Sequence, residues 1–176
     1  MTVPASHGVV LILLSAALIF VAVFDARYRR IPNALVAGIA ITGFAHSFLG
    51  GVRGGMASLL GAGLGVALLS VQFARGWIGA GDVKLLGAVG SWAGAMGTLY
   101  IFIGGSVLGG VLAVVALARL SKKARVDVAK TLSSFTRDGV LAVPGPSTLA
   151  RTQGIPYGVA LAIAAMIVLS RGAWGA

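Results

Sequence analysis

The sequence predicts an all-α fold: a polytopic membrane protein built as a bundle of about six transmembrane helices, with its N-terminus outside. Hydrophobic residues make up 58% of the 176 residues and charged residues only 10%, whereas soluble domains contain about 25% charged residues. The mean hydropathy is +0.99. The apolar residues also form runs, and since a helix needs about 20 of them to cross the hydrocarbon core, this length accommodates roughly six spans.

The first apolar run, over residues 8–24, is predicted to be a transmembrane helix and not a cleaved signal peptide. A signal peptide carries its positive charge before the apolar run and small residues at its end. Here no Lys or Arg precedes the run, and the sequence DARYRR follows it directly. The segment is therefore retained as the first helix, ending at Phe24.

The other apolar runs predict helices over residues 33–49, 56–73, 83–120 and 155–169. Pro32 precedes the first of them, where it is expected to fix the start of the helix. The run over 83–120 is too long for one span, and we divide it into two helices at a weak break over residues 95–98. All six helices belong to one predicted domain, residues 1–176.

The basic residues are distributed unevenly between the predicted loops. With the N-terminus outside, only Arg53 and Arg171 of the 14 Lys and Arg residues fall in outer segments. Short loops rich in Lys and Arg stay in the cytoplasm, so this bias sets the orientation. It also accounts for the formal net charge of +10 without a nucleic-acid partner, because a soluble nucleic-acid binder would gather its basic residues on a folded polar domain.

Glycines recur one helical turn apart in three places: Gly61 and Gly65, Gly90 and Gly94, and Gly105 and Gly109. Small residues at this spacing allow helix backbones to approach closely in lipid. We interpret these glycines as packing residues.

Residues 121–153 form the one extended polar connection, on the predicted inner side. Val128, Leu132 and Phe135 have helical spacing, which is typical of a short amphipathic helix lying on the inner leaflet. Its basic side chains would then contact anionic lipid headgroups. The alternative is a solvated connector.

The composition predicts neither a metal nor a cofactor. The chain contains no Cys, which excludes disulfides, thiolate metal sites and cysteine nucleophiles together. Its two histidines, His7 and His46, are far apart in the sequence and have no other ligand types nearby. We interpret each as a terminal or interfacial side chain.

Four carboxylate side chains occur in the chain, all of them Asp, and two of these border long apolar runs. Asp25 follows the first predicted helix, which runs from outside to inside. Asp82 precedes the helix that begins near Val83 and runs from inside to outside, so both acids are predicted at one membrane face. An ionisable group at this depth is a functional-site hypothesis by default.

Each aspartate also has a purely structural interpretation. Asp82 could cap the first free N–H groups of its helix, and Asp25 could pair with Arg27 or Arg29. The remaining acids, Asp127 and Asp138, lie in the basic inner connection and are expected to be solvated.

Together, Asp25 and Asp82 fit general acid–base hydrolysis. Two carboxylates that are close enough to share a proton do not both ionise easily. The charged one can take a proton from water while the neutral one polarises a peptide carbonyl. The sequence leaves open which aspartate is the base and which is the acid.

Three segments carry a resemblance to a known family. The sequence GAGDVKL at 79–85 resembles the GxGD signature of the prepilin peptidases, which are membrane aspartic proteases. The sequence DARYRRIPN at 25–33 resembles their first aspartate motif, and GIPYG at 154–158 is similar to their closing motif. The three segments occur in the expected order and extend over most of the chain.

The resemblance implies a peptidase of the bacterial inner membrane, with its active site at the cytoplasmic face. Its partners would be membrane lipids and a type IV prepilin-like precursor, whose short basic leader is cut off after a Gly that precedes an apolar helix. Asp25 and Asp82 would be the catalytic pair. Supporting roles would fall to Gly79, Gly81, Lys84, Arg27, Pro32 and Asn33.

The two glycines and the lysine of the GAGDVKL segment are expected to shape the backbone around Asp82. Gly79 and Gly81 are expected to let the backbone before Asp82 turn tightly and approach a strand of the substrate. Lys84 is expected to hold Asp82 or the neighbouring loop in place.

The chain departs from the longest members of that family, which carry a cytoplasmic insertion with paired cysteines associated with N-methylation. Here the first loop is only residues 25–32 and Cys is absent, so methyltransferase activity is not expected. The chain resembles the short, peptidase-only form linked to tight-adherence (Flp-type) pili.

Two other functions remain open. One is a small transporter that uses both aspartates as a proton or cation relay, although transporters usually place acids near the bilayer midplane on broken helices. The other is a noncatalytic assembly protein of a pilus or secretion machine, in which the aspartates serve as caps only.

Overall fold

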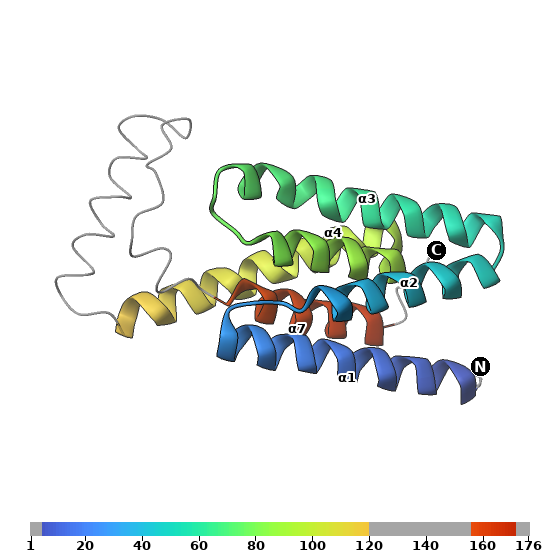
Figure 1. The fold of residues 1–176 in the computed structure, drawn as a ribbon, viewed down its shortest axis with the longest axis horizontal. Helices are drawn as coiled ribbons and strands as arrows, with labels where there is room; N and C mark the ends of the chain where they lie inside the picture. The colour runs from blue at the N-terminus through green and yellow to red at the C-terminus, as the bar shows by residue number, and fades with distance from the viewer. Residues whose placement is uncertain (1–4, 120–155, 172–176) are drawn as a thin grey trace.

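The computed structural model describes residues 5–119 and 156–171, and every element within them is a helix. The helices are α1 (Ala5–Tyr28), α2 (Asn33–Leu49), α3 (Val52–Ala74), α4 (Ala80–Arg119) and α7 (Tyr157–Ser170). They lie side by side in one elongated bundle (Figure 1). Three of them, α1, α3 and α4, are long and apolar enough to cross a membrane, while α2 and α7 are shorter apolar helices.

The predicted all-α membrane bundle is therefore confirmed, and the chain is a membrane protein. The number of six spans stays a prediction. The connection over 121–153, with its predicted surface helix and with Asp127 and Asp138, lies outside the described residues.

A single glycine divides α4 into two helical segments. Gly94 has φ 67° and ψ −179° inside an otherwise helical stretch, a backbone conformation that glycine adopts without steric cost. In Figure 1 the segment after Gly94 runs back toward the end at which α4 begins. The predicted division of the run over 83–120 is thus confirmed, with the break one residue before the predicted one.

The segment of α4 before Gly94 forms the centre of the bundle. Residues 85–94 are all buried, as expected for a helix that is apolar on every side. Helices α2, α3 and α7 pack on α4, and α1 packs mainly on α7. Helices α1 and α2, although consecutive, barely touch each other.

Close contacts between backbones explain the spaced glycines. A Cβ added at Gly65 in α3 would lie 2.7 Å from the carbonyl oxygen of Leu86 in α4. A Cβ at Gly105 in the second segment of α4 would lie 2.7 Å from Leu161 in α7. Both contacts confirm the predicted packing role, since only a residue without a side chain permits this approach.

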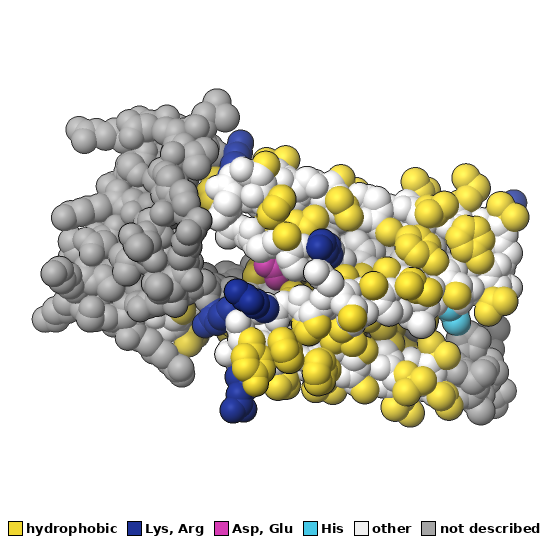
Figure 2. Space-filling model, in the orientation of Figure 1, with side chains coloured by type: hydrophobic (Ala, Val, Ile, Leu, Met, Phe, Trp, Pro, Cys, Tyr) yellow, Lys and Arg dark blue, Asp and Glu magenta, His cyan; other side chains and the backbone are white. Residues whose placement is uncertain are grey.

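The outer surface carries many apolar side chains, distributed over the whole length of the bundle (Figure 2). The basic side chains gather mainly at one end. Arg27, Arg29, Arg30, Arg75 and Lys84 all belong to helix ends that meet there, while Arg53 and Arg171 belong to the opposite ends. This distribution agrees with the predicted orientation for the described residues.

The predicted boundaries of α1 and α4 are wrong in ways that affect the site. Helix α4 begins at Ala80, before the predicted start near Val83, so Asp82 lies within its first turn and does not precede it. Helix α1 continues past Phe24 to Tyr28, so Asp25 lies within its last turn and not beyond it. Arg29 ends the helix with a positive φ of 53°, and its N–H donates to the Asp25 carbonyl at 2.9 Å. Helix α3 begins at Val52, four residues before the predicted start, because Gly51 adopts a φ of 97° there.

Candidate active site

The two aspartates lie next to each other at the basic end of the bundle. Asp25 belongs to the last turn of α1 and Asp82 to the first turn of α4, and these two helix ends meet at the same end of the molecule (Figure 1). Gly158, which lies against Asp25, and Gly81, which precedes Asp82, both contact the side chain of Ile31, and the charge of Asp25 acts on Asp82. The sequence predicted a common depth, and the structure brings the two groups together.

Asp25 is the more deeply buried of the two, with 7% of its surface exposed. Its Oδ2 atom is buried without a hydrogen bond of good geometry among the described residues, but the backbone N–H groups of Gly158 and Val159 act on the carboxylate. The start of α7 packs against it, because a Cβ added at Gly158 would lie 2.8 Å from this oxygen. Burying a carboxylate is costly, and the free N–H groups at the start of a helix such as α7 partly offset that cost.

Asp82 is partly buried and makes one local hydrogen bond. Its Oδ2 accepts from the N–H of Gly79 at 3.2 Å. Since α4 begins at Ala80, Asp82 is the third helical residue and reaches back to the residue before the helix, which is one half of a capping box. The predicted capping role is therefore present, but a carboxylate has a second oxygen and can do chemistry as well.

All three sequence motifs meet around the side chain of Ile31. A Cβ at Gly81 would lie 3.2 Å from the Cβ of Ile31, and a Cβ at Gly158 would lie 2.8 Å from its Cδ1. The absence of a side chain at Gly81 thus makes room for Ile31 of the same chain, and the predicted approach to a substrate strand stays a prediction. The left-handed residue of the preceding turn is Gly76, with φ 70°, and neither Gly79 nor Gly81 has a positive φ.

A hydrogen bond between two motifs explains the predicted role of Lys84. Its Nζ donates to Oδ1 of Asn33 at 3.1 Å. The bond connects the first residue of α2 to the first turns of α4, so Lys84 holds the loop and not Asp82. Pro32 is the residue just before α2, as predicted, and its carbonyl accepts from the N–H groups of Leu35 and Val36.

Of the basic residues beside Asp25, Arg29 is the one that the geometry singles out. Arg27 is exposed in the last turn of α1, whereas the charge of Arg29 acts on Asp25. Arg29 also has a positive φ, which is uncommon for a residue with a side chain and is often found at functional sites. The sequence analysis named Arg27 because of the motif and gave Arg29 only a pairing role.

Two hydroxyl groups complete the polar side of the site and were not predicted. The Ser106 and Tyr157 hydroxyls are 3.4 Å apart, and the charge of Asp82 acts on Tyr157. Tyr157 lay within the third motif, so a signal for it existed. No sequence signal pointed to Ser106. Ser106 and Asp82 each lie twelve residues from Gly94, and only the reversal of α4 at Gly94 brings them to the same depth.

This arrangement places two neighbouring carboxylates, one buried and one accessible, at the end of a membrane bundle. Two carboxylates in one site can take different protonation states, which acid–base hydrolysis requires. Within residues 5–119 and 156–171, no three His, Cys, Asp or Glu side chains cluster in a way that could hold a metal ion.

The comparisons with known proteins give one match. Residues 12–114, more than half of the chain, match the model of the type IV leader peptidase family. The matched region contains Asp25 and Asp82 and ends before α7. Neither the curated proteins nor the solved structures contain a match.

Proposed function

Since the chain belongs to the type IV leader peptidase family, we propose that it is an aspartic endopeptidase whose catalytic pair is Asp25 and Asp82. The observation that carries this proposal is the juxtaposition of these two side chains, which come from helices far apart in the sequence. The burial of Asp25 against the start of α7 supports it further.

The proposed chemistry needs only the two carboxyl groups and a water molecule. The ionised carboxylate takes a proton from water, which attacks the scissile carbonyl carbon. The protonated carboxyl donates a hydrogen bond to the carbonyl oxygen, and a proton is then delivered to the leaving amine as the C–N bond breaks. The two groups exchange protonation states in the course of one turnover.

The proposed substrate is a prepilin-like precursor, of the Flp type, with a short basic leader and an apolar helix. We place the cut at the cytoplasmic face of the inner membrane, because five of the seven Lys and Arg residues whose side chains the structure describes lie at the same end of the bundle as the aspartates. Peptidase activity alone is proposed, because α1 and α2 are joined by residues 29–32, which leave no room for an inserted domain.

The proposal is tested with a model precursor in membranes. This precursor carries a short basic leader that ends in Gly, followed by an apolar helix of about 20 residues. Wild-type protein is expected to reduce its mass by that of the leader, measured by mass spectrometry after co-expression. A precursor that stays intact under these conditions would contradict the proposed peptidase activity.

The membrane face is tested separately, which is straightforward because the chain has no Cys. A single cysteine at Arg30→Cys is expected to react with a membrane-impermeant maleimide only from the cytoplasmic side. Arg53→Cys, at the opposite end of the bundle, is the matched control and should react only from outside. The reverse labelling pattern would overturn the proposed orientation.

The bond between Lys84 and Asn33 is expected to support the rate without taking part in the chemistry. Lys84→Met and Asn33→Ala should each slow cleavage of the model precursor about fivefold, as the loss of one exposed hydrogen bond of about 1 kcal/mol predicts. Because both substitutions remove the same contact, the double variant should be no slower than the slower single variant.

Arg75→Met is the control for this pair. Arg75 is a cation at the same end of the bundle, but its guanidinium carbon lies 5.1 Å from the ring centroid of Trp77 and it does not bind Asn33. Its substitution is expected to leave the cleavage rate at the wild-type value. If the losses at Lys84 and Asn33 instead multiply in the double variant, the two side chains act independently and their bond has no functional role.

A further inference from the structure

We propose that the apolar groove between α1 and α2 holds the transmembrane helix of the precursor, the segment that follows the cleaved bond. This inference rests on the proposed peptidase function and adds the surface that recognises the uncut substrate. It is argued from the lining of the groove, its openness to the outside and its position relative to the two aspartates.

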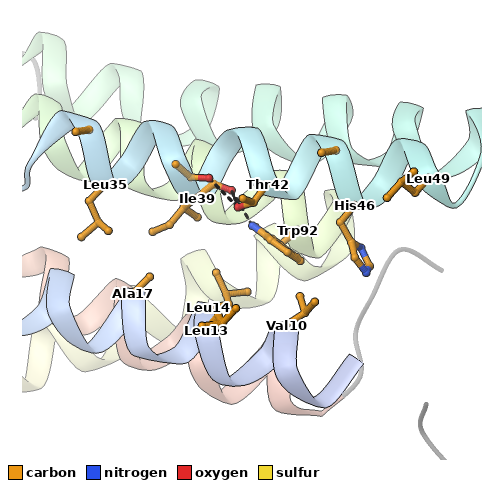
Figure 3. A pocket seen from close by; sticks show the side chains of 13 residues that line it. Val10, Leu13, Leu14, Ala17, Leu35, Ile39, Thr42, His46, Leu49 and Trp92 are labelled. Atoms are coloured by element: carbon orange, nitrogen blue, oxygen red, sulfur yellow. Dashed lines mark hydrogen bonds between the residues drawn. The ribbon is translucent and has the colours of Figure 1, made fainter. Parts of the chain in front are cut away.

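The groove has a volume of about 470 Å³ and lies between two helices that barely contact each other. Figure 3 shows its walls: Leu13 and Ala17 project from α1, and Leu35 projects from α2 toward them. Trp92 of α4 lies at its floor, held in place because its Nε1–H donates to the Ile39 carbonyl at 2.8 Å.

The lining is mainly apolar, and its polar side chains are Thr42 and His46, whose ring lies 5.2 Å from that of Trp92 between centroids. The Thr42 hydroxyl donates to the carbonyl of Gly38 at 2.7 Å and lies 3.1 Å from that of Ile39, so it is satisfied within its own helix. Leu13 is 66% exposed and Leu49 is 88% exposed. These side chains are therefore available to an apolar partner that approaches from the surrounding lipid.

Small residues on the wall suit a helix better than a fatty acyl chain. Gly38 and Ala45 lie on the α2 side and Ala17 on the α1 side. Helices associate in lipid through close packing at small residues, because lipid provides no hydrophobic force between them. A partner helix can thus bring its backbone near α2 and place one row of aliphatic side chains in the groove.

The groove also extends in the direction that a substrate requires. Its lining on α2 begins at Ala34 and ends at Leu49, a distance of about 22 Å or roughly four helical turns. Ala34 follows Asn33, which is bonded to Lys84 beside Asp82. One end of the groove thus lies toward the end of the bundle that holds the proposed catalytic aspartates, with Ala17 about 12 Å along α1 from Asp25, and the other reaches toward the opposite membrane face.

The part of the substrate that follows the cleaved bond is expected to continue into the bilayer along this groove. The peptide bond is cut at the end of a membrane bundle, so the part that stays in the bilayer must be helical to satisfy its backbone groups. A helix seated between α1 and α2 would present its first residues to Asp25 and Asp82. The groove would then set the register of the cut.

The first test traps the uncut precursor by disulfide cross-linking, which the Cys-free chain makes specific. Asp25→Asn keeps the model precursor intact, and Thr42→Cys is paired with single cysteines along the precursor helix. Cross-links are expected at positions one helical turn apart. Leu60→Cys, 63% exposed on α3 and outside the groove, is the control and should give none.

The second test fills the groove without disturbing the fold. Among the described residues, a Cβ added at Gly38 or at Gly63 meets nothing within 4 Å, and both glycines are exposed within helices. Gly38→Leu should raise KM for the model precursor about tenfold, as expected for the loss of one packed side chain's contacts. Gly63→Leu, in α3 and away from the groove, should leave KM unchanged.

The outcomes separate this inference from the proposed function. If the aspartate variants abolish cleavage but Thr42→Cys gives no cross-links and Gly38→Leu behaves as Gly63→Leu, the groove holds lipid and the inference is overturned. If the aspartate variants still cleave the precursor, the proposed function itself fails. Cross-links together with a raised KM support substrate binding in the groove.

Discussion

Asp25→Asn and Asp82→Asn are each expected to reduce cleavage of the model precursor by about 10²- to 10⁴-fold, the usual contribution of general acid–base catalysis. Asn has nearly the same shape as Asp but cannot alternate between a base and an acid. At position 82 the amide oxygen can still accept the Gly79 N–H bond, so the start of α4 is retained. Loss of activity would therefore reflect chemistry and not capping.

The other two aspartates provide matched controls for this prediction. Asp127→Asn and Asp138→Asn remove the same charge, and with them all four carboxylate side chains of the chain are tested. Both variants are expected to cleave at the wild-type rate. The rates are measured by mass spectrometry of the precursor, and circular dichroism in detergent checks that helicity is retained.

The double variant gives a further constraint. If Asp25 and Asp82 act as one unit, then replacing both costs no more activity than replacing either one. Wild-type cleavage by either single Asn variant would contradict the aspartic mechanism. In that case the noncatalytic assembly role, in which the aspartates serve only as caps, would be favoured over the peptidase function.

Gly158→Ala is expected to have the next largest effect, a fall in kcat of about 100-fold. The added Cβ would lie 2.8 Å from Asp25 Oδ2 and 2.8 Å from Ile31 Cδ1, which is closer than such atoms approach. The carboxylate must then move, and a displacement of about 1 Å at a catalytic group costs on the order of 100-fold in rate. The measurement is kcat and KM for the model precursor.

Two further variants test whether the contact between position 158 and Asp25 causes the expected fall in kcat. Gly110→Ala adds the same methyl group to α4 at a position where, among the described residues, nothing lies within 4 Å, and it should cleave normally. Ile31→Val in the Gly158→Ala background removes the Cδ1 contact and should restore part of kcat. If Gly158→Ala cleaves at the wild-type rate, α7 does not position Asp25.

Much of the fold was predictable because the lengths of apolar runs and the glycines between them directly reflect membrane physics. Helix α2 has the predicted bounds of 33–49, since Pro32 precedes it and Gly50 follows. The division of α4 was predicted within one residue of Gly94. The common depth of Asp25 and Asp82 followed from the alternating direction of the helices.

The remaining features depend on tertiary contacts that no local pattern reveals. Ile31 fits between Gly81 and Gly158 only because α1, α4 and α7 meet at one point. Ser106 reaches Tyr157 only because of where α4 reverses. The extension of α1 past Asp25 depends on the positive φ of Arg29, which the residue type disfavours and the packed loop imposes.

The contact between Gly158 and Asp25 has a consequence for biosynthesis. It joins the first described helix to the last, and the two residues are separated by 133 positions, so the ribosome makes Asp25 long before it makes its neighbour. Until α7 enters the bilayer, the carboxylate of Asp25 lacks the backbone that holds it beside Asp82. If Asp25 and Asp82 are the catalytic pair proposed above, cleavage is therefore expected to begin only after α7 has been inserted.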